Sequence, residues 1–429
     1  MKKRYIKSVK AYQVFSKRGH PGVEAVVLTE GGIEEKAICT AGLSVGTFEI
    51  PFQYDGGEKW NGKGVSKAAA SVEQVIEFKL LGMDVTDQCA LDQAMLELRN
   101  DPNVEVGGNA VAAVSAAVLK AGAAALEIPL YRHIGGTNAC TLPVPASPAI
   151  SGHLRYGGGV TTPCGKPSIT FCCYDFPAYS EASYAAWDVH NHWTEEMTKM
   201  GLFDNRDPHM YFSVPQGHFP DDEALFALMG EVIIKAGYEN RIGIQLDCAA
   251  DTYFNKKDGK YYGLLTPEPK DKDQLMKLYH RLVRNTPLVI IEDPFEETDY
   301  KSHAELTRTV DIQIVGDDLF TTNQERVQHG ASIGAANTVL LKVNQVGTIS
   351  ESLEMVRCAY ENGYGIMPCS SRGEGVTIAD YSVGINAGTI REAAVDETAN
   401  RLLEIERELG KSAVFLGKRG LKGKRFQGR

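Results

Sequence analysis

Short, almost wholly apolar runs recur in the second half of the chain. Four of them end in one charged side chain or an adjacent pair: residues 242–247, 288–293, 312–317 and 338–342. A strand that is buried on both faces is apolar along its whole length. The four runs therefore predict buried strands whose ends carry charged groups.

The spacing of these charged ends is regular. Glu292 and Asp317 are 25 residues apart, Asp317 and Lys342 are again 25 apart, and Asp247 precedes Glu292 by 45. One strand, one helix and two loops take about 25 residues, which is the repeat of a parallel barrel. The longer interval leaves room for an insertion around residues 256–260. We predict an α/β fold built on a (β/α)8 barrel.

The N-terminal third has a different pattern. Residues 6–12 and 23–28 alternate as strands do, and residues 66–126 follow a helical pattern until a proline ends it. We therefore predict two domains, an N-terminal α+β domain over residues 1–140 and the barrel over residues 141–429.

Composition and charge narrow the classes of function. The 429 residues are 43% hydrophobic and 23% charged, as in globular proteins, and the net charge of −10 opposes binding to nucleic acid. The most apolar stretch, residues 106–130, is interrupted by polar residues, so we predict a buried helix and no membrane span. Nine cysteines without a CxxC pair indicate reduced thiols and a cytoplasmic protein.

The charged strand ends predict a metal-assisted reaction. Carboxylates from Asp247, Glu292 and Asp317 would meet at the barrel mouth and repel one another unless a cation lay between them. Hard oxygen ligands suit Mg²⁺, with Mn²⁺ as the alternative. The metal charge would lower the pKa of Lys342, which could then act as a general base. The chemistry that follows is removal of a proton alpha to a carboxylate through an enolate.

Short motifs along the chain match those of one known family. They are Lys17-Arg18-Gly19-His20-Pro21, Ser44-Val45-Gly46, Gly107-Gly108-Asn109-Ala110, Ile128-Pro129-Leu130-Tyr131, Leu246-Asp247-Cys248-Ala249, Ile291-Glu292-Asp293-Pro294-Phe295, Gly316-Asp317-Asp318-Leu319, the run from Leu340 to Thr348, Ile378-Ala379-Asp380 and Leu403-Glu404-Ile405-Glu406. With these motifs the chain resembles the enolase (phosphopyruvate hydratase) family over nearly its whole length.

The resemblance implies a fold and a site. The fold would be an enolase-type (β/α)8 barrel, with its first strands partly antiparallel, behind an N-terminal α+β capping domain. The resemblance implies Mg²⁺ held by Asp247, Glu292 and Asp317. It also implies Lys342 as the base, a possible second Mg²⁺ liganded through Ser44, and a homodimer. Arg391 stands where the family has a second active-site lysine; it can clamp a carboxylate but cannot carry a proton.

The acid side of the site departs from the family. The family segment Gly-Asp-Glu-Gly-Gly reads Val-Pro-Gln-Gly-His-Phe at residues 214–219, and a second family glutamate has no counterpart in residues 165–171. His218 is a candidate replacement acid, and Gln216 is a candidate substrate contact. Lys166 could be a substrate contact, a second base or a surface residue.

The family's phosphate-contacting loop is also changed. Ser-His-Arg-Ser-Gly-Glu is replaced by Cys-Ser-Ser-Arg-Gly-Glu at residues 369–374, and the chain is two residues shorter afterwards. The candidate substrate contacts here are Ser370, Ser371 and Arg372. His153 is the candidate for a further family histidine. Residues 184–216 are rich in aromatic residues and histidine, and we interpret this segment as reshaping the pocket, with plain packing as the alternative.

The metal site and the base are therefore kept, while the acid side is rebuilt. We predict a Mg²⁺-dependent lyase that removes the proton alpha to the carboxylate of a small phosphorylated or phosphonylated acid resembling 2-phosphoglycerate. Two alternatives stay open within the enzyme class, an enzyme like carboxyphosphonoenolpyruvate synthase of phosphonate biosynthesis and an elimination of ammonia. A non-catalytic enolase-like binding protein is the alternative of another class.

Overall fold

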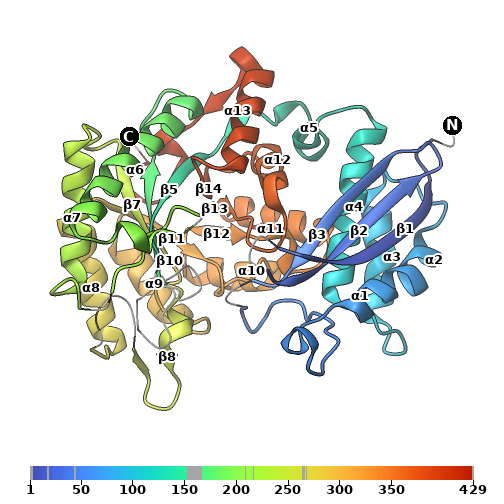
Figure 1. Ribbon diagram of the computed structural model, residues 1–429, viewed down its shortest axis with the longest axis horizontal. Coiled ribbons are helices and arrows are strands. Elements are labelled where there is room, and N and C mark those ends of the chain that lie inside the picture. Colours follow the sequence, from blue (N-terminus) through green and yellow to red (C-terminus); the bar gives the residue numbers. More distant parts are fainter. Residues whose placement is uncertain are drawn as a thin grey trace.

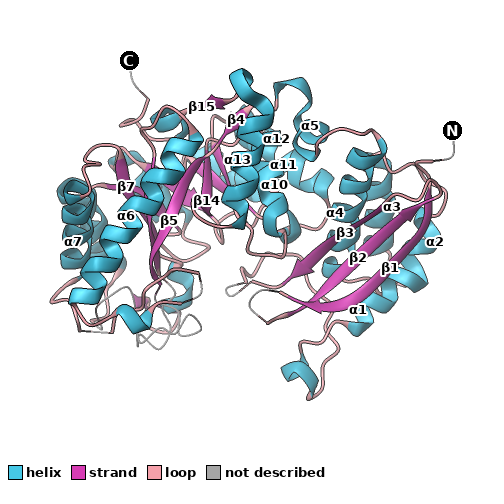
Figure 2. Ribbon diagram, turned by 45° about the horizontal axis from the view of Figure 1, so that its top comes forward, coloured by secondary structure: helices cyan, strands magenta, loops and turns pink. Residues whose placement is uncertain are grey.

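A computed structural model of the protein shows two bodies side by side, a small sheet with helices and a barrel (Figure 1). The structure describes residues 3–16, 19–42, 45–151, 167–207, 209–215, 217–262, 266 and 268–427. Figure 2 shows the small sheet on one side of the molecule and α6 and α7 on the other.

The cap is a three-stranded antiparallel sheet packed on helices. Its strands are β1 (Ile6–Phe15), β2 (Pro21–Thr29) and β3 (Glu34–Thr40), in that order, and its helices are α1 (Ser66–Ser71), α2 (Glu77–Leu80), α3 (Gln88–Asn100) and α4 (Gly108–Ala125). Alternate residues of β2 are fully buried, as in a sheet with one covered face. By length and composition α4 could cross a membrane, but 83% of it is buried inside the protein, as expected of a core helix.

The second body is a nearly closed barrel. Its strands are β5 (Val144–Ser151), β6 (Ser168–Cys173), β7 (Ile242–Asp247), β10 (Leu288–Glu292), β11 (Gln313–Gly316), β12 (Thr338–Leu341), β13 (Gly365–Pro368) and β14 (Thr389–Ala393). The order is β13-β12-β11-β10-β7-β6-β5-β14, and only the β5–β6 and β6–β7 pairs are antiparallel. The predicted barrel with partly antiparallel first strands is confirmed.

Helices cover the outside of the barrel. They are α6 (Tyr179–Lys199), α7 (Asp222–Lys235), α8 (Lys272–Asn285), α9 (Tyr300–Thr309), α10 (Gln324–Ile333), α11 (Ile349–Glu361), α12 (Ile378–Gly384) and α13 (Glu397–Leu409). The remaining short elements are α5 (Leu130–Gly135), β4 (Thr141–Leu142), β8 (Phe254–Asn255), β9 (Lys260–Tyr261) and β15 (Val414–Phe415). The domain boundary at residue 140 stays a prediction.

A buried carboxylate joins the cap to the barrel. Asp92 on α3 accepts hydrogen bonds from the Ser115 hydroxyl of α4 at 2.5 Å, and from the backbone N–H and hydroxyl of Ser350 at 2.9 and 2.7 Å. Ser350 lies in the first turn of α11, where backbone N–H groups lack partners within the helix. Next to it, Arg99 of α3 forms a two-pronged ion pair with Glu351. These contacts fix the cap over α11.

Replacing Asp92 with alanine is expected to destabilise the protein by about 3 kcal/mol, because buried donors on both bodies lose a charged acceptor. Urea unfolding followed by circular dichroism measures the loss. Asp273→Ala, at an exposed position on α8, is the matched control. An equal effect of the two substitutions would contradict the role of Asp92 as the link.

Candidate active site

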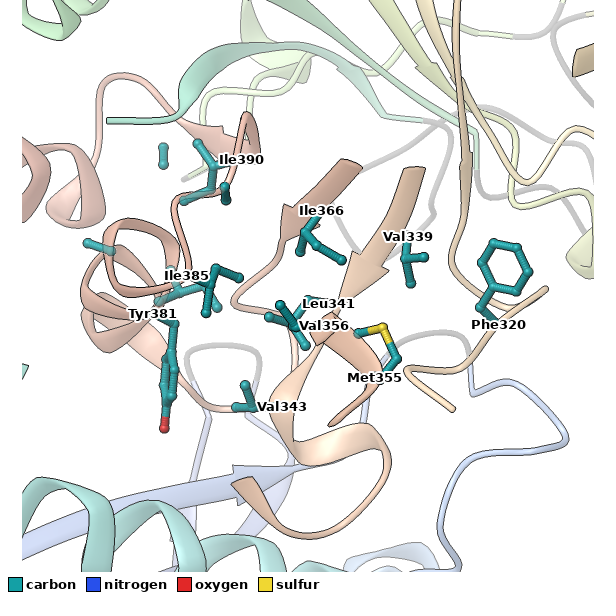
Figure 3. Close-up of a cluster of buried hydrophobic side chains, with 14 of the residues drawn as sticks. Phe320, Val339, Leu341, Val343, Met355, Val356, Ile366, Tyr381, Ile385 and Ile390 are labelled. Carbon is teal, nitrogen blue, oxygen red and sulfur yellow. The ribbon is translucent and has the colours of Figure 1, made fainter. Parts of the chain in front are cut away.

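The alternation of side chains along β12 decides which of them reach the barrel mouth. Val339 and Leu341 pack outward among the helices (Figure 3), whereas Leu340 belongs to a separate cluster inside the barrel. Successive side chains of a strand point to opposite faces. Lys342 follows in extended conformation, with φ −124° and ψ 102°, so it lies on the same side as Leu340.

The neighbouring strands follow the same rule. Ile290 of β10 and Val315 of β11 belong to the interior cluster, and Glu292 and Asp317 follow them by two positions. Asp247 ends β7 and is paired in register with Glu292. The strand ends therefore bring the three predicted carboxylates and Lys342 to one mouth, where all four are at least 95% buried.

Two of the predicted metal ligands lie within reach of one cation. Among the described residues, carboxylate oxygens of Glu292, Asp293 and Asp317 lie within 4.8 Å of one another. Asp293 also accepts the backbone N–H groups of Asp317 and Asp318 at 2.9 and 2.8 Å, and so holds the end of β11 in place. Asp247 is outside this group, and its role as a metal ligand stays a prediction.

Arg391 joins Asp247 to Glu292. Its guanidinium donates to Asp247 Oδ2 at 3.0 Å and to Glu292 Oε2 at 3.2 Å, and also to the Ser168 hydroxyl at 2.6 Å. Ser168 in turn donates to Asp247 Oδ2 at 3.3 Å. A guanidinium carries a fixed fork of donors, so it holds the two carboxylates at a set separation.

Lys342 lies against Asp317 in a buried ion pair. Burial lowers the pKa of its ammonium, but the surrounding negative charges, with Asp317 first among them, outweigh burial and hold the pKa above the usual value. Gln345 donates to the other Asp317 oxygen at 3.3 Å and accepts from the Thr322 hydroxyl at 2.8 Å. The orientation of Asp317, and with it that of Lys342, is therefore fixed.

The charges of this site fit a divalent cation. The pKa of Glu292 is raised to about 8: burial is the largest cause, Arg391 opposes it, and the carboxylates of Asp247 and Asp317 add to it. Among the described residues paired here, the two cations Lys342 and Arg391 face four carboxylates when all are ionised, Asp247, Glu292, Asp293 and Asp317. Clustered carboxylate oxygens are the donors that Mg²⁺ prefers, so the residues present fit this ion.

Arg372 makes a buried ion pair with the cap. Its guanidinium is 99% buried and forms a two-pronged ion pair with Glu49 of the cap, with Nε 3.1 Å from Oε2. Arg372 thus ties the loop after β13 to the cap, and its predicted contact with substrate stays a prediction. Ser370 and Ser371 lie in the same loop and line a cavity to which the cap and the barrel both contribute.

Of the remaining predicted site residues, the structure describes His218. His218 is exposed in a short turn, where its ring packs against Phe219, and its role as an acid stays a prediction. The other predictions, Ser44, His153, Lys166 and Gln216, lie outside the described residues.

The aromatic and histidine-rich segment divides into two parts. On α6, Trp193 donates to the Ala149 carbonyl at 3.2 Å and the His190 ring is hydrogen-bonded to the Pro148 carbonyl at 2.9 Å. These side chains are buried against β5, so here packing is the correct interpretation. His209 and Tyr211 instead line the same cavity as Ser370 and Ser371.

Ser168 is a site residue that sequence reasoning missed. It is the first residue of β6 and pairs in register with Asp247. In a parallel strand only the last residues reach the mouth, but β6 runs antiparallel, so its first residue does. The strand direction was the signal that could have identified it.

Comparison with known proteins agrees with this geometry. Residues 6–134 match the family model "Enolase, N-terminal domain", and residues 217–424 match "Enolase, C-terminal TIM barrel domain". The enolase of Bifidobacterium animalis subsp. lactis is 38% identical over 427 residues, covering 96% of this chain and 97% of that protein. The enolase of Methanocaldococcus jannaschii is 38% identical over 426 residues, covering 95% and 96%.

The matches to both enolase domains, together with a barrel that has acidic strand ends and a buried lysine at its mouth, identify a lyase of the phosphopyruvate hydratase type. The chain belongs to the enolase family.

Proposed function

We propose that this protein is a Mg²⁺-dependent lyase that removes the proton alpha to the carboxylate of a small phosphorylated or phosphonylated acid. The observation that carries the proposal is the buried pairing of Lys342 with Asp317, whose carboxylate also lies within cation-binding reach of Glu292. A base and a cation site in contact are what enolate formation needs.

Glu292 and Asp317 would hold Mg²⁺, together with Asp247 or Asp293. The bound ion would stabilise the negative charge that develops on the substrate carboxylate. Neutralising Asp317 would remove the largest influence that raises the pKa of Lys342 and would leave burial to lower it. Lys342 could then take the proton from the alpha carbon, and Arg391 could bind the carboxylate.

The acid side supports a specialised member of the family. Ser168 is a hydroxyl residue at the mouth, and Arg391 and Asp247 engage its oxygen. His218, the predicted replacement acid, is exposed. Without a positioned acid, expulsion of hydroxide loses about 10²–10⁴-fold in rate. We therefore expect the alpha proton of a 2-phosphoglycerate-like acid to be removed at a higher rate than its hydroxyl group is lost.

Purified protein with Mg²⁺ and 2-phosphoglycerate in D₂O tests the proposal. We expect deuterium to enter the alpha position, read by mass spectrometry, at a rate at least about 10-fold above that of enol formation, read by absorbance, because the base is present and the acid is rebuilt. EDTA is the control and should stop the exchange. Enol formation as fast as exchange would refute the specialised role, and the absence of exchange would refute the proposed activity.

Localisation and assembly are also proposals. We propose a cytoplasmic protein, supported by the free state of the eight cysteines within the described ranges, and a homodimer, which the family membership suggests. The two enzymatic alternatives, a phosphonate-pathway reaction and loss of ammonia, would use the same base and metal site.

A further inference from the structure

A cavity of about 290 Å³ is lined by residues of both the cap and the barrel. Cap, barrel and the segment before residue 214 all contribute to its lining, which includes Thr40, His209, Tyr211, Ser370, Glu392 and Asp396. Glu392 follows Arg391 on β14. Ser370 of the lining follows Cys369, whose backbone N–H donates to the carbonyl of Leu341, the residue before Lys342, at 2.9 Å, so the cavity lies near the proposed reaction centre.

The backbone at Glu392, which lines this cavity, is conformationally strained. Glu392 and Ala393 have φ values of +68° and +59°, and a non-glycine residue held in the left-handed region costs about 1–2 kcal/mol. Strain of this kind persists where surrounding structure enforces it, and it clusters at functional sites. Two strained residues in succession thus mark Glu392 as a positioned group.

Tyr211 holds the Glu392 carboxylate. The Tyr211 hydroxyl donates to Glu392 Oε1 at 2.5 Å, and the second oxygen, Oε2, makes no hydrogen bond with any described residue. Asp207 accepts the backbone N–H of Tyr211 at 2.9 Å and donates its own to the Tyr211 carbonyl at 2.8 Å. Phe212, the next residue, is hydrogen-bonded to the backbone of β5. Tyr211 is therefore fixed to the barrel wall.

The chemistry of the cavity selects the group that fits it. Among the described residues that line it are two carboxylates, one imidazole and several hydroxyls, but no lysine or arginine. Asp396 is already used to cap α13 through the N–H of Ala399, which leaves Glu392 as the available acceptor. A phosphate group in this cavity would be repelled by the two carboxylates. A hydrogen-bond donor would instead give the Glu392 carboxylate a partner.

We propose that this cavity is a substrate subsite in which Glu392, held by Tyr211, accepts a hydrogen bond from a hydroxyl or ammonium group of the substrate. The inference rests on the proposed function, since the carboxylate end of the substrate would lie at the metal site. Glu392 is thereby a specificity-determining residue.

Calorimetric titration of the full, Mg²⁺-loaded protein tests the subsite with three probes that share one head group. They are 2-phospholactate, 2-phosphoglycerate, which adds a 3-hydroxyl, and 3-amino-2-(phosphonooxy)propanoate, which adds a 3-ammonium. Because its donor would face the Glu392 carboxylate, the favoured probe with a 3-hydroxyl or 3-ammonium group is expected to bind at least about 10-fold more tightly than 2-phospholactate. In Glu392→Ala this advantage should fall below about twofold, while the affinity for 2-phospholactate stays within about twofold.

Two further variants sharpen the result. Glu392→Gln should abolish an ammonium advantage but only weaken a hydroxyl advantage, which distinguishes the two groups. Tyr211→Phe should weaken the advantage by loosening Glu392. The matched controls are Glu239→Ala and Tyr184→Phe at exposed positions.

Equal binding of the three probes by the unmodified protein would overturn the subsite and leave the proposed function standing. The same conclusion would follow if Glu392→Ala weakened all three probes equally. No binding of any probe in the presence of Mg²⁺ would overturn the proposed function and the subsite with it.

Discussion

Replacing Lys342 with alanine is expected to lower the rate of alpha-proton exchange by about 10²–10⁴-fold, the contribution of a general base. Among the described residues, no other lysine pairs with the carboxylates of the barrel mouth, so none of them is placed to substitute for it. The measurement is deuterium uptake by 2-phosphoglycerate in D₂O with Mg²⁺. Mg²⁺ affinity, measured by calorimetry, should change far less than the rate.

The variant Lys342→Arg distinguishes the role of Lys342 as a base from the role of its positive charge. Arginine keeps a positive charge next to Asp317 but does not release its proton at any working pH, so it should be as inactive as the alanine variant. Lys277→Ala, at an exposed position on α8, is the control for loss of a lysine. Exchange that survives in both Lys342 variants would show that another group is the base and would favour a non-catalytic role for Lys342.

The barrel could be predicted because its strands carry a repeated signal. Glu292, Asp317 and Lys342 each end an apolar run at a constant interval, and the structure places each at the same end of neighbouring parallel strands. Inward and outward positions alternate along a strand. The sequence pattern therefore also indicated that these side chains lie together.

The parts that could not be predicted depend on contacts between distant segments. Arg372 follows a loop that resembles the family's, yet it is drawn to Glu49, which is 323 positions away. Ser168 reaches the site because β6 runs antiparallel to its neighbours.

No local sequence feature predicts the role of Glu392, because its position also depends on a contact with a distant segment. Glycine would mark a left-handed backbone, but neither Glu392 nor Ala393 is a glycine. The position of the Glu392 carboxylate depends on Tyr211, which Asp207 holds through a backbone hydrogen bond. Long-range pairings of this kind leave no periodic trace in the sequence.

Replacing Arg391 with alanine is expected to destabilise the metal-free protein by about 3–5 kcal/mol, because the variant leaves Asp247 and Glu292 buried without their shared cation. The free energy of unfolding in urea, with EDTA present, gives the size of the effect. Saturating Mg²⁺ should recover part of the loss, since it binds only the folded state and supplies the missing positive charge. The stabilisation by Mg²⁺ should accordingly be larger in the variant than in the unmodified protein.

The pH dependence of this loss has a definite sign. The pKa of Glu292 is raised to about 8, mainly by burial, even with Arg391 present to oppose the rise, so the variant should raise the pKa further. A raised carboxyl pKa contributes stability at low pH that is lost as the pH rises through it. The destabilisation should therefore be larger at pH 9 than at pH 6. Arg308→Ala removes an arginine without an ion pair in the described structure and is the control. Equal losses at both pH values, or no effect of Mg²⁺, would show that Arg391 does not act as the counter-ion of the two carboxylates.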